Sequence, residues 1–182
     1  YDGFRFRDYP LIMGIDSLST PLHQAVKKLC EGPDGLYYAL LFQGGITCFD
    51  KDIEKFLPVR FDKPLELKDI LDFCWNDGSL YLVTSQGLFE SRIVRKTEGK
   101  HDFVLCLLNP EPVVRGKIAH LCSDGKTNLY FSVNQRKVVH HDLVAKKTSL
   151  IKEYSVVNRL FLRYGYLWIC RLWDDIICYD LK

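Results

Sequence analysis

Four short segments of the sequence carry the side chains that could recognise a ligand. Each lies between two apolar, β-branched runs, which predicts a turn between two strands. The candidate binding residues are Phe42, Gln43, Gln86, Asn134, Gln135, Arg136, Trp173 and Asp174. Amides, an acid and flat aromatic rings suit a sugar, because they pair with its hydroxyl groups and cover its apolar C–H faces. The alternative is that such polar residues are simply frequent in turns.

No arrangement of residues in the sequence predicts catalysis. Acidic residues are scattered through turns, and neither a Gly-x-Ser-x-Gly turn nor a phosphate-binding glycine loop occurs. His140 and His141 are neighbours on one strand, so their rings point to opposite faces and cannot share a metal ion. His120 is followed by apolar residues, and we expect it to be hydrogen-bonded in the core. We therefore predict no catalytic residue, no metal site and no cofactor.

The candidate turns belong to a repeat that occurs four times. Its clearest copy, residues 70–92, predicts three short strands joined by an Asn-Asp-Gly turn and a Gln-Gly turn. The other copies are residues 26–50, 118–142 and 156–180. A further apolar run follows each of the first three copies, at residues 56–61, 103–108 and 148–154. A repeat of roughly 40 to 50 residues with four strands is typical of β-propeller blades.

The repeat predicts an all-β fold, a single β-propeller segment over residues 1–182 with four blades of four-stranded antiparallel sheet. The expected blades cover residues 26–61, 70–109, 118–154 and 156–182, and residues 4–9 form a further outer strand. Two arrangements stay open. Residues 4–9 complete the fourth blade of a closed four-bladed ring, or they end an earlier blade of a longer propeller from which this chain is excised.

The seven cysteines follow the same repeat. Cys30, Cys74 and Cys122 occupy one position of it, and Cys48 and Cys178 occupy another. No two cysteines form a Cys-x-x-Cys pair, and none is spaced with histidines as zinc ligands are. Periodic placement on apolar strands predicts small core residues and few or no disulfides.

Aromatic residues of the repeat fall into two groups. The residues expected to pack between blades on the second strand are Tyr37, Tyr81, Tyr130 and Trp168. Trp75 is expected to lie with the turn acids Asp77 and Asp124, at the end of the molecule opposite the candidate binding turns.

Composition restricts the partners that the chain could have. A net charge of +2 without a basic run gives no indication of nucleic-acid binding. No stretch approaches about 18 consecutive apolar residues, so we expect no insertion into a membrane. The chain lacks an initiator methionine and begins inside a repeat motif, which suggests a processed product or an excised segment.

Residues 77–88 resemble the two-component regulator propeller repeat, whose core is Asp-Gly-x-Leu-Trp-Ile-Gly-Thr-x-x-Gly-Leu. Residues 165–170 are similar to the same core, and residues 1–9 are similar to the Tyr-Asp-Gly-x-x-Phe segment between repeats. The chain departs from this core in two respects. The small residue after Trp-Ile is replaced by Ala39, Val83, Ser132 and Cys170, and tryptophan fills the aromatic position only at Trp168.

The resemblance implies a seven-bladed propeller in the periplasmic part of a membrane-bound hybrid histidine kinase. In that family two propellers and a β-sandwich domain lie outside the inner membrane, and many members are associated with sensing breakdown products of polysaccharides. The resemblance therefore implies a periplasmic ligand-sensing segment that is not itself an enzyme and responds to polysaccharide-derived oligosaccharides. A periplasmic location would also allow thiols to oxidise.

The expected partners are a small carbohydrate, the remaining propeller and sandwich domains of the parent kinase, and a second copy of the parent in a homodimer. Two other functions stay open. One is a scaffold propeller that binds another protein through the same turns. The other is a small propeller hydrolase or lyase, against which the lack of a clustered acid pair counts.

Overall fold

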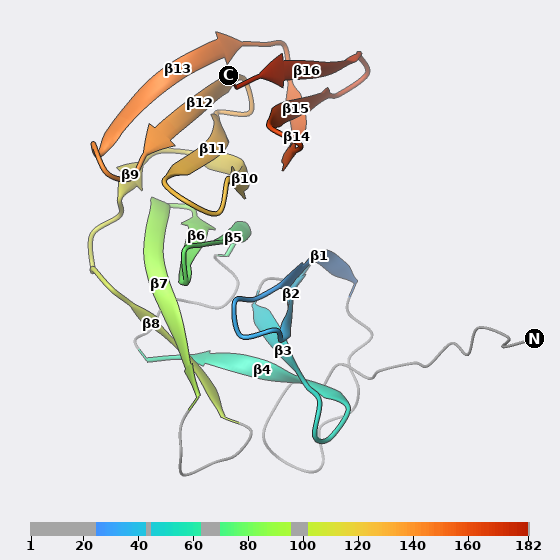
Figure 1. Cartoon of the computed structure of the whole chain (residues 1–182), viewed down its shortest axis with the longest axis vertical. Helices are drawn as coiled ribbons and strands as arrows, with labels where there is room; N and C mark the ends of the chain where they lie inside the picture. The colour runs from blue at the N-terminus through green and yellow to red at the C-terminus, as the bar shows by residue number, and fades with distance from the viewer. Residues whose placement is uncertain (1–24, 43–44, 63–69, 96–101, 182) are drawn as a thin grey trace, which may run out of the picture.

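The computed structural model describes residues 25–42, 45–62, 70–95 and 102–181, and every regular element within them is a β-strand. The strands form four consecutive antiparallel groups around a common axis (Figure 1). The first strand of each group lies nearest the axis. The predicted all-β propeller fold is confirmed.

The strands of each blade are named A to D, from the axis outward. Blade 1 consists of β1 (Val26–Glu31), β2 (Tyr37–Leu41), β3 (Ile46–Asp50) and β4 (Lys55–Phe61). Blade 2 consists of β5 (Asp72–Asn76), β6 (Ser79–Thr84), β7 (Gly87–Arg95) and β8 (Phe103–Leu107). Blade 3 consists of β10 (Ile118–Ser123), β11 (Asn128–Val133), β12 (Lys137–Asp142) and β13 (Lys147–Glu153). Blade 4 consists of β14 (Val157–Arg163), β15 (Tyr166–Arg171) and β16 (Ile176–Asp180). The short strand β9 (Val114–Arg115) connects blades 2 and 3.

Turns that contain two consecutive residues with positive φ angles join several of these strands. Asp77 and Gly78 have φ angles of 45° and 79° between β5 and β6, and Asn134 and Gln135 have φ angles of 52° and 56° between β11 and β12. Two consecutive positive φ angles are typical of type I′ turns, whose twist matches that of the flanking strands. The turn residues therefore fix the register of these hairpins.

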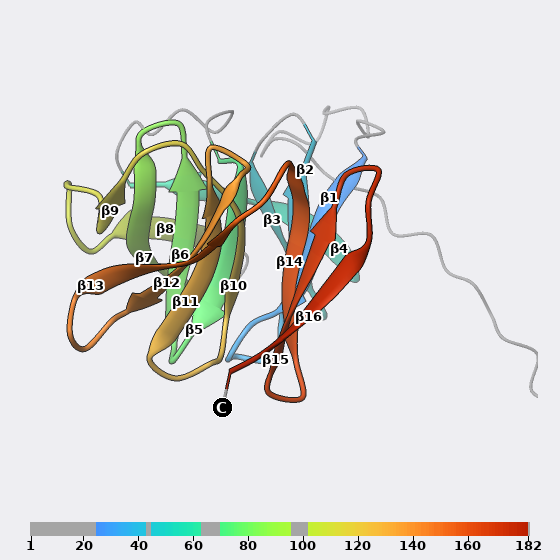
Figure 2. The same cartoon turned by 90° about the horizontal axis from the view of Figure 1, so that it is seen from above.

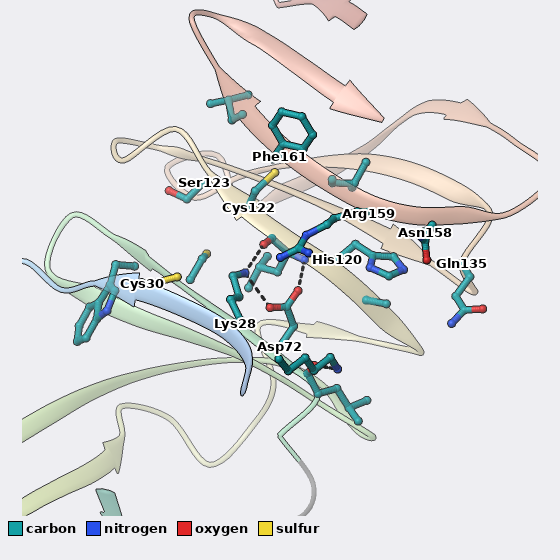
Figure 3. A pocket seen from close by; sticks show the side chains of 18 of the residues that line it. Lys28, Cys30, Asp72, His120, Cys122, Ser123, Gln135, Asn158, Arg159 and Phe161 are labelled. Atoms are coloured by element: carbon teal, nitrogen blue, oxygen red, sulfur yellow. Dashed lines mark hydrogen bonds and ion pairs between the residues drawn. The ribbon is translucent and has the colours of Figure 1, made fainter. Parts of the chain in front are cut away.

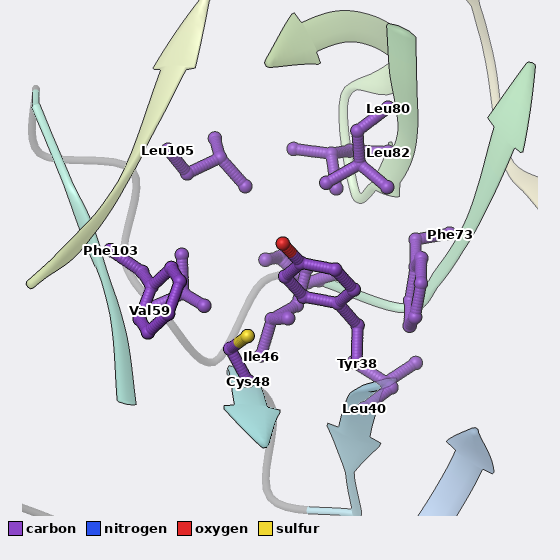
Figure 4. Close-up of a cluster of buried hydrophobic side chains, with 11 residues drawn as sticks. Tyr38, Leu40, Ile46, Cys48, Val59, Phe73, Leu80, Leu82, Phe103 and Leu105 are labelled. Carbon is purple, nitrogen blue, oxygen red and sulfur yellow. The ribbon is translucent and has the colours of Figure 1, made fainter. Parts of the chain in front are cut away.

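Three apolar clusters hold neighbouring blades together. The first lies between blades 1 and 2 and includes Tyr38, Phe73 and Phe103 (Figure 4). The second lies between blades 2 and 3 and includes Phe131, and the third lies between blades 3 and 4. Because successive side chains of a strand point to opposite faces, each middle blade contributes to two clusters. The hydrophobic core therefore consists of layers between blades.

Blades 1 and 2 are joined at their outer strands, which corrects the prediction of four separate antiparallel sheets. β4 pairs with β8 in parallel, so the two blades form one nine-stranded sheet that also includes β9. The reason lies in the length of β7. Its first five residues pair with β6, whereas its last five pair with β8. The outer strand is therefore carried away from β6 and toward blade 1, and Phe103 and Leu105 pack in the cluster between the two blades.

The strand register also corrects two aromatic assignments. Cys30 lies opposite Tyr38 in the sheet, as Cys74 lies opposite Tyr81, so Tyr38 and not Tyr37 packs between blades. Tyr38 is 1% exposed and Tyr37 43% exposed. Both Tyr38 and Tyr81 stand four residues after a turn aspartate, and this spacing sets the register. Trp75 belongs to β5 and not to a turn, and its ring contacts that of Tyr38 at a centroid distance of 5.2 Å.

The opposite orientation of the two neighbouring histidines of β12 is confirmed. His141 is 2% exposed, and its Nδ1 is 2.8 Å from the hydroxyl of Thr148. His140 stacks on Tyr130, and its Nε2 is 2.6 Å from the Oδ1 atom of Asn128. The two rings therefore have separate partners.

Several predictions concern residues outside the described ranges. These include the outer strand over residues 4–9, the candidate residue Gln43 and the turn over residues 96–101. Within the described residues, blade 4 has three strands. The closed four-bladed ring and the longer propeller therefore both stay predictions.

Gly87 provides a test of the sheet extension at β9. Its φ angle is 142°, and an added Cβ atom would collide with the carbonyl group of Val114. We expect Gly87→Ala to lower the free energy of unfolding in urea by about 2–4 kcal/mol, from backbone strain and the displaced strand. The control is Gly78→Ala, where φ is 79° and the space is open, so only strain of about 1–2 kcal/mol is expected. Equal losses in both variants would contradict the close approach of β9.

Candidate ligand-binding pocket

One end of the molecule, here called the upper face, carries the turns between strands B and C and the connections between blades. The Phe42 N–H donates to the Ala25 carbonyl at 2.9 Å, and the Asn134 N–H donates to the Lys117 carbonyl at 2.9 Å. In blade 4 the Leu172 N–H donates to the Val156 carbonyl at 3.1 Å. Figure 2 shows the β6–β7, β11–β12 and β15–β16 turns along one edge of the molecule. The B–C turns therefore share a face, as expected.

A pocket of about 780 Å³ lies between the innermost strands β1, β5, β10 and β14 of the four blades (Figure 3). Phe42 and Gln135 line it from the upper face. At the end of the pocket away from the upper face it is lined by Glu31 and Ser123, the last residues of β1 and β10. All four blades thus contribute to a single pocket, and a bound molecule could contact every one of them.

The polar side chains in the wall of the pocket follow the repeat. The residues that align the four copies are Cys30, Cys74, Cys122 and Phe161. Two residues before each of them stand Lys28, Asp72, His120 and Arg159, here called the inner ring. Sequence reasoning missed this set. The sequence pattern that could have revealed it is a charged residue or a histidine in every repeat, two positions before the residue that aligns the copies.

The backbone is irregular where three members of the inner ring are placed. The register shifts between Val26 and Lys28 in β1, and between Val157 and Arg159 in β14. It shifts again in β10, between Ala119 and Cys122. Such bulges insert a residue into one strand and change the direction of its side chains, and they are frequent at binding sites. The bulges therefore determine how ring side chains enter the pocket.

Lys28 and Asp72 form an ion pair that reaches into blade 3. Their Nζ and Oδ1 atoms are 2.8 Å apart, with side chains 20% and 13% exposed. Lys28 also donates to the Leu121 carbonyl at 3.1 Å, while Asp72 Oδ2 accepts the Leu121 N–H at 2.7 Å. Leu121 lies in the bulge of β10, outside the regular pairing with β11. The ion pair therefore satisfies both backbone groups of Leu121 and links blades 1, 2 and 3.

The charge of Asp72 keeps Lys28 protonated. Burial by itself would lower the pKa of Lys28, but the nearby carboxylate and its hydrogen bond outweigh this effect and raise the pKa above its usual value. Lys28 therefore stays charged at neutral pH, and its ion pair with Asp72 neutralises that charge. They form a structural pair that leaves the rest of the ring available.

His120 lies in the wall of the pocket and not in the apolar core where we expected it. It occupies the bulge of β10 with a φ angle of 55° and is half-buried. Burial lowers its pKa, whereas a hydrogen bond with the backbone of Val157 acts in the opposite direction. The Nε2 atom of His120 is buried and has no hydrogen-bond partner among the described residues.

Arg159 is the fourth member of the inner ring. It is exposed, and within the described ranges it makes neither an ion pair nor a hydrogen bond. Its charge is close enough to disfavour protonation of His120. In Figure 3 its guanidinium extends from β14 toward the centre of the pocket. A guanidinium carries only donors, so this group is suited to bind an acceptor or an anion.

Below the inner ring the pocket is lined by thiols. Cys74 is buried, whereas Cys30 and Cys122 are half-buried, so the expectation that all three are core residues holds only for Cys74. Burial raises the pKa of all three thiols, that of Cys122 to about 12, although Lys28 acts in the opposite direction. None of the seven cysteines forms a disulfide in the structure.

In the structure, the candidate residues of the B–C turns fall into two groups. Phe42 and Gln135 line the pocket. The residues that do not line it are Gln86, Asn134, Arg136, Trp173 and Asp174. Trp173 is 92% exposed, and Asp174 pairs with Arg171 at 2.5 Å. Strand A lies closest to the axis, so most turns between strands B and C are placed around the rim of the pocket. Whether these rim residues bind a ligand stays a prediction.

The described residues limit two other kinds of site. Among them, no group of three or more His, Cys, Asp or Glu side chains could hold a metal ion. In the same part of the chain, no helix is long and apolar enough to cross a membrane.

Comparison with known proteins shows the fold and not the family. No protein-family model matches the chain, and no curated protein matches it. The extracellular domain of BT4673 from B. thetaiotaomicron, described as a one-component system, is similar with a TM-score of 0.65 and 15% identity over 87% of this chain and 23% of that one. The extracellular domain of the hybrid two-component system BT3049 from the same species is similar with a TM-score of 0.57 and 13% identity, over 94% of this chain and 25% of that one.

The WD40 domain of Pan2 from Neurospora crassa is similar with a TM-score of 0.56 and 11% identity, over 88% of this chain and 49% of that one. The chain spans between about a quarter and a half of the length of these three structures. At these identities the likeness establishes a β-propeller fold. Extracellular domains of Bacteroides sensors are among the proteins that share it.

The environments of the thiols predict an order of reactivity. Cys178 is exposed, whereas Cys74 is 7% exposed and has a pKa raised well above its usual value by burial. We expect a maleimide to label Cys178 first at pH 7.5 and to leave Cys74 unmodified until the protein unfolds, because thiolate and access are both required. Mass spectrometry of tryptic peptides gives the order. Equal labelling rates at both residues in the native protein would contradict the position of Cys74.

Replacing Asp72 tests the link between blades. Asp72→Asn leaves the Lys28 ammonium without its counter-charge, so we expect a loss of about 2–3 kcal/mol in the free energy of unfolding. The double variant Lys28→Gln/Asp72→Asn should lose less than the sum of the single variants. Because the pKa of Lys28 is raised, its contribution is present below pH 10.5 and is lost as the pH rises further. Additive losses would show that the two residues do not interact.

Proposed function

We propose that this chain is a ligand-sensing propeller segment of a larger extracytoplasmic receptor. The observation that carries this proposal is the axial pocket, to which each blade contributes one member of the inner ring. A pocket built from all four blades suits a sensor, because one ligand can change how the blades pack against one another. The fold shared with extracellular domains of B. thetaiotaomicron sensors supports this function.

The parent protein is, on this proposal, a membrane-bound two-component histidine kinase, and the segment lies in the periplasm. The resemblance of residues 77–88 and 165–170 to the two-component regulator repeat supports this assignment. The partners are then the remaining propeller and sandwich domains of the parent and a second parent copy. Phosphotransfer belongs to other parts of that protein, and this segment contributes binding and no enzymatic step.

Oligosaccharides released from polysaccharides are the proposed ligands. Phe42 provides an aromatic surface at the mouth of the pocket, and Gln135 and Asn158 provide amides that both donate and accept. An oligosaccharide longer than one or two sugar units would also contact the residues at the rim of the pocket. In this role Trp173, which is 92% exposed, covers a sugar face, and the amides of Gln86 and Asn134 bind hydroxyl groups.

A scaffold that binds another protein is the second candidate. The observation in its favour is a set of exposed apolar side chains on the upper face, with Phe42 68%, Leu172 41% and Trp173 92% exposed. Aromatic residues of this kind are enriched in protein interfaces. A hydrolase or lyase is less well supported, because Asp72 is already engaged by Lys28 and by the Leu121 N–H.

Titration with saccharides tests the proposed function. We expect at least one oligosaccharide from a panel of plant, algal and host glycans to bind in calorimetry and to raise the melting temperature. Phe42→Ala should weaken that binding about tenfold through the loss of the aromatic surface. The control is Lys126→Ala in the turn between β10 and β11, at the opposite end of the molecule, which should leave the affinity unchanged. No binding by any saccharide, or equal effects of the two variants, would contradict a sugar-sensing pocket.

A further inference from the structure

An aspartate followed by a glycine lies in the turn between strands A and B of each of the first three blades. The pairs are Asp34-Gly35, Asp77-Gly78 and Asp124-Gly125. Each glycine has a positive φ angle, between 71° and 79°. The three turns therefore have the same two residues in similar glycine conformations, and they differ in what surrounds these residues.

An Asp-Gly pair can react with itself in water. The glycine nitrogen attacks the Cγ atom of the protonated aspartate side chain and loses its proton to solvent, while the carboxyl hydroxyl leaves as water. The new N–C bond closes a succinimide ring, and a water molecule then opens the ring at either carbonyl. One product is aspartate, and the other is isoaspartate, in which the main chain runs through the side-chain carbon. Glycine favours the attack because it has no Cβ atom to obstruct it.

The turn in blade 1 holds both reacting groups. Asp34 Oδ1 accepts the Leu36 N–H at 3.1 Å, and its Oδ2 accepts the Tyr38 hydroxyl at 2.6 Å. The attacking group is engaged as well, because the Gly35 N–H donates to the Gly32 carbonyl at 3.0 Å. Ring closure at Asp34 therefore has to break hydrogen bonds at the carboxylate and at the nitrogen.

The turn in blade 3 is held more firmly. Asp124 Oδ1 accepts the N–H groups of Lys126 and Asn128 at 2.8 and 3.0 Å, and its Oδ2 accepts the Asn128 amide at 2.6 Å. The Gly125 N–H donates to the Ser123 hydroxyl at 2.8 Å. Partial burial by itself would raise the pKa of Asp124, but the hydrogen bonds from Asn128 and the backbone outweigh it and lower the pKa. The protonated form that loses water is therefore rare at this residue.

The turn in blade 2 holds neither group. Asp77 and Gly78 are both exposed, between the paired residues Asn76 and Ser79. Within the described ranges, the Asp77 carboxylate has no hydrogen bond or ion pair, and the Gly78 N–H has no acceptor. Tyr81 stands at the repeat position of Tyr38, but its hydroxyl is hydrogen-bonded with Glu90 and not with the turn aspartate.

We propose that Asp77 is a site of spontaneous modification, at which the native chain forms a succinimide and then isoaspartate while Asp34 and Asp124 stay protected. The reaction needs only water and the two residues of the turn. The inference goes beyond the proposed function, since it holds whatever the pocket binds.

The position of Asp77 connects this modification with the packing of blades 2 and 3. The preceding residue, Asn76, donates its amide to the Lys126 carbonyl at 2.8 Å and accepts the Ser123 hydroxyl. Isoaspartate adds one main-chain atom directly after Asn76, in a turn whose two residues fix the register of β5 and β6. We therefore expect the modified chain to lose part of this contact between the blades and to melt at a lower temperature.

The test follows isoaspartate at the three turns in one sample. The native chain is incubated for weeks at mildly acidic pH in water enriched in heavy oxygen, which every passage through the succinimide incorporates. Mass spectrometry of tryptic peptides then gives the rate at each aspartate. We expect Asp77 to react at least about fivefold faster than Asp34 or Asp124, since breaking one protecting hydrogen bond slows a reaction by about that factor. In guanidinium chloride the three rates should become similar.

Two tyrosines at the same repeat position provide matched variants. Tyr38→Phe removes one hydrogen bond from the Asp34 carboxylate, so the rate at Asp34 should rise about threefold or more. Tyr81→Phe removes a hydroxyl that does not contact Asp77, so the rate at Asp77 should change by less than about twofold. Asp124 in the same samples reports any general loosening of the fold and should react as in the native chain.

Each result decides the proposal. Fast reaction at Asp77 alone, with the three rates equal in the unfolded chain, supports it. Equal rates at the three turns of the native chain would show that the hydrogen bonds do not protect, and the proposal would be wrong. Reaction at Asp77 in the unfolded chain only would show that the turn itself prevents the attack, which overturns it as well. A rise at Asp124 equal to that at Asp34 in Tyr38→Phe would contradict the protective role of the Tyr38 hydroxyl.

Discussion

The contact on which the centre of the molecule depends is the one between Lys28, Asp72 and the backbone of Leu121. A bulge in β10 removes Leu121 from regular pairing, and a buried backbone N–H or carbonyl without a partner costs about as much as a lost hydrogen bond. Asp72 and Lys28 supply both partners. The three innermost strands that come together here belong to blades 1, 2 and 3, so one polar junction fixes their separation and gives the pocket its width.

Apolar packing holds the blades together around this junction. The clusters between blades bury residues such as Tyr38, Phe131 and Leu167 almost completely. The parallel pairing of β4 with β8 adds a second connection between blades 1 and 2, far from the axis. The first two blades are therefore joined at their outer strands, whereas blades 3 and 4 remain separate sheets that pack through side chains.

The pocket has one part in which the polar side chains are paired with protein groups and another in which they are not. In the first part Lys28 and Asp72 are saturated by each other and by Leu121. In the second part His120 and Arg159 keep unused hydrogen-bonding capacity among the described residues. Both parts occupy the same repeat position, so the repeat supplied a scaffold on which each blade could carry a different side chain. This division explains how a repetitive fold can form an asymmetrical pocket.

The sequence alone determined the propeller, the order of strands and the face that carries the B–C turns. Turn residues such as Asp77-Gly78 and apolar alternation act over a few residues, and the repeat copies them four times, so local rules sufficed. Tertiary structure decided the pocket. The inner ring joins Lys28 to Arg159 across 131 positions of the chain, and bulges in β1, β10 and β14 determine where its side chains lie. Bulges and the parallel join of β4 to β8 arise from contacts between blades, and no local pattern encodes such contacts.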